Sequence, residues 1–199
     1  MIEIGRLLRS DISGCVFGTW VDVVHEPALG GMVKIAADQG YSIFGLIYDI
    51  RVEDDGLVRQ LLSSRQIAPE IMQDNRRNRN VPVEISVLFL GYEHKNVIYH
   101  LLPPRPPLSL DEIFPCTPDE LDRFTNQGFG YFRHILRDPL LPAGELLAAH
   151  FLEASTVKSK GWLKQAAQEL IVLLRDDYPR LMSLMGSLAD AHLMFVDGE

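Results

Sequence analysis

Histidines and cysteines are the residues of this chain that could carry out acid–base, nucleophilic or metal chemistry. The 199 residues include His25, His94, His100, His134, His150 and His192, together with Cys15 and Cys116. No two histidines have the HxxxH, HxH or HxxEH spacing that would bring metal ligands together on one helix or strand. The two cysteines lie far apart and outside any CxxC or Cys/His group, which argues against a zinc site.

Motifs for phosphate binding and for nucleophilic catalysis are missing from the sequence. Neither GxxxxGK[ST] nor GxSxG occurs, so the chain predicts no P-loop and no serine-hydrolase site. The segment GFGYF at 128–132 has part of a dinucleotide-binding spacing, but it is more typical of a turn before aromatic packing. We therefore predict no catalytic residues, no cofactor and no bound metal. An enzyme with an unrecognised site is the alternative.

One basic run could contact a partner. Arg76, Arg77 and Arg79 lie among asparagines at the end of the segment 56–80. This run is either a basic linker or a tentative interaction surface for phosphate or for an acidic face of a partner. The net charge of −8 argues against a protein whose main task is to bind nucleic acid, because that task usually requires a basic surface.

The elements that would position these residues begin with short strands rich in β-branched and aromatic residues. The expected strands cover residues 3–9, 15–24, 31–37, 41–52, 81–92 and 96–102. Six such strands, separated by Gly, Asp and Pro, indicate a barrel or a sandwich. Gly18 and Gly45 lie inside two of them, where a glycine permits the sharp bend that closes a small barrel; a plain bulge is the competing explanation.

The rest of the chain is predicted to be helical. A helical insertion is expected at 56–80, and the proline-rich run at 101–113 is expected to end the strand region as a stiff linker. Thr117 with Pro118 and Glu120 forms a strong helix start, and apolar periodicity predicts further helices at 142–155, 161–177 and 178–195. The prediction is an α+β fold: a β domain at 1–108, containing a six-stranded β-barrel, followed by a small helical bundle at 109–199.

The strand region resembles the HerA-ATP synthase barrel (HAS-barrel) family. Ile4-Gly5-Arg6-Leu7 resembles the family's IGRV strand, Gly31 to Ile35 its G-x-x-V-x-I strand, and Phe44 to Ile50 its hxGxVxxI strand. The resemblance covers about residues 1–108. It implies a six-stranded barrel that usually precedes a ring-forming ATPase and packs against like barrels in an oligomer. This chain has a short helical region in place of the ATPase core, so no catalytic residue of the family has a matching position.

The resemblance and the missing P-loop together predict a non-catalytic protein-interaction or assembly module. Its partner would be a second copy, bound through the barrel, or a separate ring ATPase. The alternative is a DNA-processing accessory protein of a HerA-type translocase, which the family's translocases and the three arginines favour. The first ten residues carry charges, and no apolar stretch approaches the length of a membrane span. We therefore expect a cytoplasmic protein that does not bind membranes.

Overall fold

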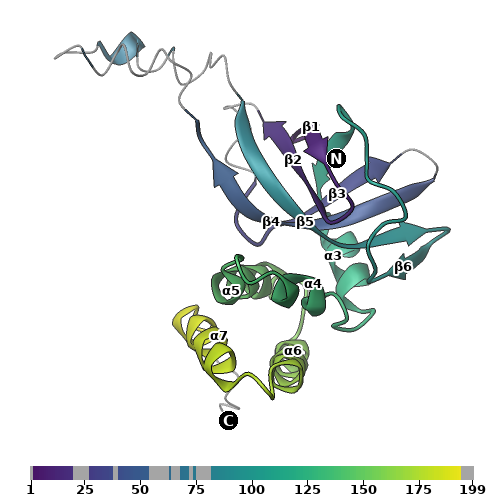
Figure 1. Cartoon of the computed structure of the whole chain (residues 1–199), viewed down its shortest axis with the longest axis vertical. Coiled ribbons are helices and arrows are strands. Elements are labelled where there is room, and N and C mark those ends of the chain that lie inside the picture. Colours follow the sequence, from purple (N-terminus) through teal and green to yellow (C-terminus); the bar gives the residue numbers. More distant parts are fainter. Residues whose placement is uncertain are drawn as a thin grey trace.

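The computed structural model describes residues 2–19, 27–37, 40–53, 63, 68–71, 74 and 82–193. Its strands are β1 (Gly5–Ser10), β2 (Gly14–Thr19), β3 (Met32–Ala37), β4 (Tyr41–Arg51), β5 (Val83–His94), β6 (Val97–Tyr99) and β7 (Glu112–Pro115). The helices that follow them are α3 (Pro118–Thr125), α4 (Phe132–Arg137), α5 (Ala143–Ala154), α6 (Lys160–Leu173) and α7 (Tyr178–Asp190) (Figure 1). Most of the predicted insertion at 56–80 lies outside the described residues.

Six of the strands close into an antiparallel β-barrel. The order around the ring is β1-β7-β3-β4-β5-β2, and the pairing of β2 with β5 completes it. Strand β6 is not part of the ring. It pairs with the last residues of β5, Tyr92 to His94. The predicted α+β class and the six-stranded barrel are therefore confirmed.

The identity of the sixth barrel strand differs from the prediction. The segment expected to supply it, 96–102, contributes only β6, whereas the ring is closed by β7, which begins within the last residues of the proline-rich run. Ile113 of β7 pairs with Gly5 on one side and with Ile35 on the other, and its side chain is fully buried. The prediction that the proline run ends the strand region was wrong, because one buried isoleucine in a four-residue strand gives almost no periodic signal. The division into domains at residue 108 stays a prediction.

The barrel interior is one of two apolar cores. Its buried members are Ile4, Leu7, Cys15, Phe17, Val33, Ile35, Ile43, Ile47, Val83, Ile85, Val87, Phe89 and Ile113. Alternation along β4 directs Ile43 and Ile47 inward, and therefore Gly45 between them also faces inward. A Cβ on Gly45 would overlap the Val87 side chain and lie 3.1 Å from the Leu88 carbonyl oxygen.

The register of β4 and β5 also shifts at Gly45. Phe44 pairs with Gly91 and Gly45 with Phe89, which leaves Leu90 as the extra residue of a β-bulge. The structure therefore shows the bulge at Gly45, together with a crowded interior that leaves no room for a side chain, while the sharp bend stays a prediction.

The second core, the barrel–helix seam, joins the outer face of the barrel to the helices. Met32, Phe44, Leu46 and Leu90 from the barrel share it with buried side chains of α3 to α7. In Figure 1, α4 and α5 lie next to the barrel, and α6 and α7 lie on the other side of α5. The predicted helix start is confirmed: the Thr117 side chain accepts from the Glu120 N–H, and the Glu120 carboxylate accepts from the Thr117 N–H.

Candidate binding groove

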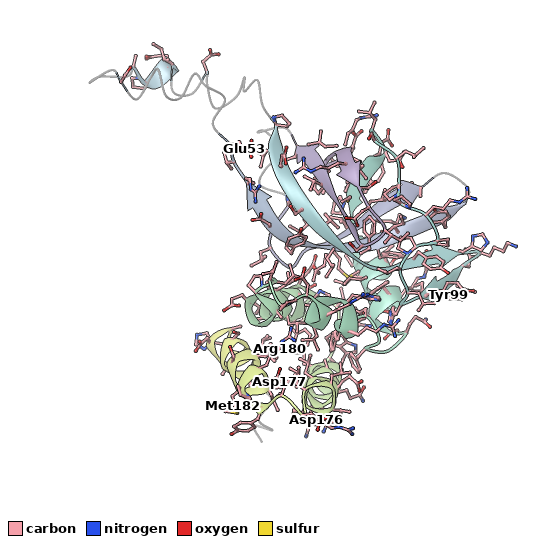
Figure 2. All side chains as sticks on the ribbon, in the orientation of Figure 1. Glu53, Tyr99, Asp176, Asp177, Arg180 and Met182 are labelled. Atoms are coloured by element: carbon pink, nitrogen blue, oxygen red, sulfur yellow. The ribbon has the colours of Figure 1, made fainter. Side chains whose placement is uncertain are left out.

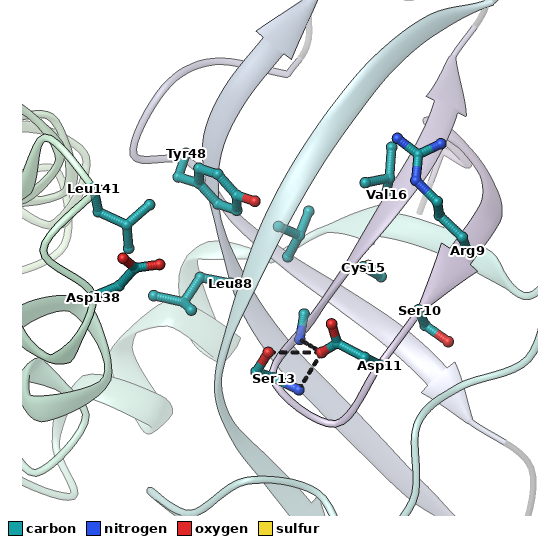
Figure 3. Close-up of a pocket in the computed structure, with 12 residues that line it drawn as sticks. Arg9, Ser10, Asp11, Ser13, Cys15, Val16, Tyr48, Leu88, Asp138 and Leu141 are labelled. Atoms are coloured by element: carbon teal, nitrogen blue, oxygen red, sulfur yellow. Dashed lines mark hydrogen bonds between the residues drawn. The ribbon is translucent and has the colours of Figure 1, made fainter.

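Two adjoining cavities lie between one turn of the barrel and the connection from α4 to α5. The first has a volume of about 240 Å³ and the second of about 460 Å³, and both are lined by Ser13, Leu88 and Asp138. We call them together the barrel–helix groove. Figure 3 shows the first cavity, with the turn between β1 and β2 on one side and Asp138 and Leu141 on the other.

Asp11 organises the barrel side of the groove. Its Oδ1 accepts hydrogen bonds from the Ser13 N–H at 2.6 Å, the Ser13 hydroxyl at 2.6 Å and the Gly14 N–H at 3.0 Å (Figure 3). The hydrogen bond from Ser13 lowers the pKa of the Asp11 carboxyl, because it stabilises the charged form. Asp11 is therefore an ionised side chain that holds a tight turn, which fixes the position of the groove wall.

Two other barrel side chains of the groove have defined chemical states. The Arg9 guanidinium lies 2.6 Å from the Glu84 carboxylate, and this hydrogen-bonded pair lowers the pKa of Glu84. Cys15 is buried, and burial raises the pKa of its thiol to about 12. Because the thiolate is the nucleophilic form, the Cys15 thiol is inert near neutral pH.

The helix side of the groove contributes His134, Arg137, Asp138 and Pro139. Nε2 of His134 lies 3.2 Å from the His100 carbonyl oxygen, and burial lowers the pKa of the ring. The Asp138 Oδ1 accepts from the Leu140 N–H at 2.9 Å and shapes the loop. Arg137 is exposed and forms no hydrogen bond or ion pair with any described residue. Its guanidinium is available to a carboxylate or phosphate that enters the groove.

Exposed apolar side chains lie at or beside both walls of the groove. Ile12, which lines the groove from the barrel turn, is 43% exposed. Leu140, which follows Pro139 and precedes Leu141 in the loop between α4 and α5, lines neither cavity itself and is 90% exposed. Apolar side chains that border a concave surface are typical of protein-binding sites. The groove can therefore hold a ligand by apolar contact and by the guanidinium of Arg137, whereas that of Arg9 is already paired with Glu84.

Other exposed apolar side chains border no such groove. Tyr99 on β6 is 37% exposed but stacks on Tyr92 at 5.1 Å between ring centroids. Met182 on α7 is 51% exposed (Figure 2). Neither residue lines one of the three cavities described for this structure.

The residues that the sequence singled out have different outcomes. Arg76, Arg77 and Arg79, the tentative interaction surface, lie outside the described residues, as does His25. The structure brings His100, His134 and His150 to the same region, around Tyr131, although the sequence spacing gave no reason to group them.

The buried pair in that region is Tyr131 and His150. The Tyr131 hydroxyl and His150 Nε2 are 2.9 Å apart, and both side chains are fully buried. Burial lowers the pKa of His150 to about 4, with a small opposing effect from the Gly30 backbone. The direction of the hydrogen bond between the hydroxyl and Nε2 depends on the tautomer of the neutral ring, and Nδ1 has no hydrogen-bond partner in the described structure.

The residues that shape the groove were missed by the sequence reasoning. Asp11, Arg137 and Asp138 come from two distant segments, and only the fold brings them together. One signal was present, because Asp11-Ile12-Ser13-Gly14 has the composition of a turn in which an aspartate caps its own backbone. That signal predicts a turn, and it contains no information about the helical segment opposite.

Within the described ranges, no group of three or more His, Cys, Asp or Glu side chains could hold a metal ion. In the same part of the chain, no helix is both long and apolar enough to cross a membrane. The chain matches no protein-family model and has no significant match among curated proteins.

Proposed function

We propose that this chain is a non-catalytic protein-interaction or assembly module, and that the barrel–helix groove receives its partner. The observation that carries the proposal is the groove with exposed apolar side chains at both walls: Ile12 lines it from the barrel turn, and Leu140 lies next to the lining residue Pro139 on the opposite side. Fully burying an exposed leucine such as Leu140 contributes roughly 1.5–3 kcal/mol, and the partly exposed Ile12 contributes a smaller amount. Arg137 adds a cation that would pair with a carboxylate of that partner.

The closed barrel supports a more specific version of the proposal. A six-stranded barrel is what the resemblance to the HAS-barrel family implies, and we propose membership of that family for residues 1–108. The partner would then be a second copy or a separate ring ATPase. We further propose that the helices form a bundle with a domain of its own, and that the protein acts in the cytoplasm.

Site-specific photo-cross-linking in cells tests the role of the groove. A photoreactive amino acid at Leu140 or Ile12 should form a defined adduct. The same amino acid at Val172, which is 58% exposed on α6, serves as the control and should not. Mass spectrometry of the adduct distinguishes a second copy from a ring ATPase. No adduct at either groove position, or equal adducts at all three, would overturn the proposal.

Ligand binding by the purified chain tests the non-catalytic assignment. The chain should neither hydrolyse ATP nor bind it tightly, because its sequence has no phosphate-binding loop. Calorimetry that shows micromolar ATP binding would contradict the non-catalytic assignment and support the alternative of an enzyme with an unrecognised site. Tight binding to duplex DNA at physiological salt would instead favour the DNA-processing alternative.

A further inference from the structure

A third cavity lies where the first half of the barrel meets α5. Its volume is about 210 Å³, and it shares no lining residue with the barrel–helix groove. The lining is mainly apolar and includes Ile4, Leu29, Met32, Ile47 and Ala149, with Glu153 as its acidic member. Sites for drug-sized ligands usually have volumes of about 300–1,000 Å³, so this cavity suits a smaller group such as one side chain.

Glu153 has one oxygen engaged and one available. Its Oε2 accepts a hydrogen bond from the Met32 N–H at 3.0 Å, which ties the end of α5 to the start of β3. Its Oε1 forms no hydrogen bond or ion pair with the described part of the chain, and because it is not among the fully buried unpaired atoms, solvent reaches it. Burial raises the pKa of Glu153 to about 7, with the Met32 N–H opposing the shift. The carboxyl group thus lacks the cation that would stabilise its charge.

The charged and titratable groups that the structure describes around Glu153 do not supply that cation. Lys34 of β3 forms an ion pair with Glu120 of α3, so its ammonium is already matched. Cys116, between β7 and α3, is half-buried, and desolvation raises the pKa of its thiol well above the usual value. Glu120 and Glu153 both contribute to that shift, which places all three groups in the same neighbourhood.

We propose that this cavity binds a primary ammonium group on a short alkyl chain, with Glu153 as the counter-ion and the apolar lining around the alkyl carbons. A guanidinium binds best to both oxygens of a carboxylate, whereas an ammonium is a compact charge that needs only one. Because Oε2 already accepts from Met32, the free Oε1 favours the ammonium. The ligand is either a free alkylamine or a lysine side chain of another protein, and both have the same chemistry at this site.

NMR titration of the full chain with n-butylammonium tests the proposal. Saturable shifts are expected at the Met32 and Ala149 amides, and the neutral isostere n-butanol should bind at least about tenfold more weakly, since one lost charge pair at a half-buried site is worth a factor of that order. Deprotonated Glu153 is the binding form. Affinity should therefore rise about tenfold between about pH 6 and about pH 8.

A matched pair of variants on α5 separates the role of Glu153 from a general effect of charge. Glu153→Gln keeps an acceptor for the Met32 N–H and should abolish both the binding and its pH dependence. Glu145→Gln, at an exposed position of the same helix, should change neither. Absence of saturable shifts in the unmodified protein, or equal affinity in Glu153→Gln, would overturn the proposal. Comparison with Nα-acetyl-lysine methylamide identifies the source: tighter binding than n-butylammonium indicates a protein side chain, and weaker binding a free amine.

Discussion

The barrel interior and the barrel–helix seam are both apolar cores, but they differ in the polar groups they contain. The buried side chains of the interior are aliphatic or aromatic, together with the inert thiol of Cys15 and the hydroxyl of Thr19, which donates a hydrogen bond to the Ile4 carbonyl oxygen and does not titrate. The seam encloses the hydrogen-bonded pair of Tyr131 and His150, and the half-buried Glu153 lies at its edge. The interior is therefore held by burial of apolar surface, which does not depend on pH, whereas the seam contains groups that titrate.

This difference assigns separate roles to the two cores. The interior fixes the shape of the barrel, and the seam determines how firmly the helices are attached to it. A change of pH or a substitution at the seam should alter the attachment of the helices while the barrel stays folded.

The largest expected effect is the truncation of a side chain in the barrel interior. Phe89 is fully buried there, and Phe89→Ala should lower the free energy of unfolding by about 3–5 kcal/mol through lost burial and a residual cavity. Urea denaturation should show the same loss of unfolding free energy at neutral pH and at mildly acidic pH. Val97→Ala, on the exposed β6, should have little effect. A loss of less than about 1 kcal/mol in Phe89→Ala would contradict the packed interior.

The next effect concerns protonation of His150 at the seam. The pKa of His150 is lowered in the folded protein, so its neutral form stabilises the fold above the unfolded pKa, and that contribution is lost as the pH falls. A shift from 6.5 to about 4 corresponds to about 3 kcal/mol, lost progressively between those two pH values.

Urea denaturation across that pH range measures the loss. His150→Gln should remove this part of the acid dependence, and the exposed His192→Gln should keep it. Glu153 acts in the opposite direction, because its raised folded pKa stabilises the fold at low pH and the contribution is lost as the pH rises through about 7. If the free energy of unfolding of His150→Gln falls with decreasing pH as steeply as that of the unmodified protein, protonation of His150 does not cause the acid dependence of the seam.

A smaller effect is expected from adding a side chain inside the barrel. Gly45→Val should cost on the order of 1–3 kcal/mol, because the new methyl groups would overlap Val87 in a filled core. The control is Gly186→Ala in α7, where an added Cβ meets nothing within 4 Å and should be neutral or slightly stabilising. Thermal melts compare the two variants. A melting temperature that Gly45→Val leaves unchanged or raises would remove the crowding argument.

The smallest effect is expected at the helix start that anchors the seam. Thr117→Ala removes the hydroxyl that accepts from the Glu120 N–H and should cost about 1 kcal/mol. Thr117→Ser keeps the hydroxyl and should recover most of the stability. Chemical denaturation of the unmodified protein and of the two variants measures these differences in the free energy of unfolding. Equal stability of all three proteins would show that the cap is dispensable.

The sequence predicted the parts of this molecule that depend on local pattern. Long apolar strands such as β4 and β5 and the capped start of α3 were found because each carries its signal within a few adjacent residues. The short α4 and β7 were missed, since six and four residues are too few for a periodic pattern.

The candidate groove could not be predicted in the same way. Its two walls, near Asp11 and near Asp138, come from segments that only the fold brings together. The burial that sets the states of Cys15, His150 and Glu153 likewise depends on packing, which residue type and spacing do not contain.

The closure of the barrel by β7 has a consequence for synthesis on the ribosome. Strands β1 and β3 each pair with β7, so the ring stays open until residue 115 has left the exit tunnel. Until then the nascent chain presents two unpaired strand edges, the kind of surface that leads to aggregation. A protein released after residue 108 would keep those edges permanently. Premature termination within the proline run should therefore yield an insoluble product, whereas release after β7 allows the ring to close.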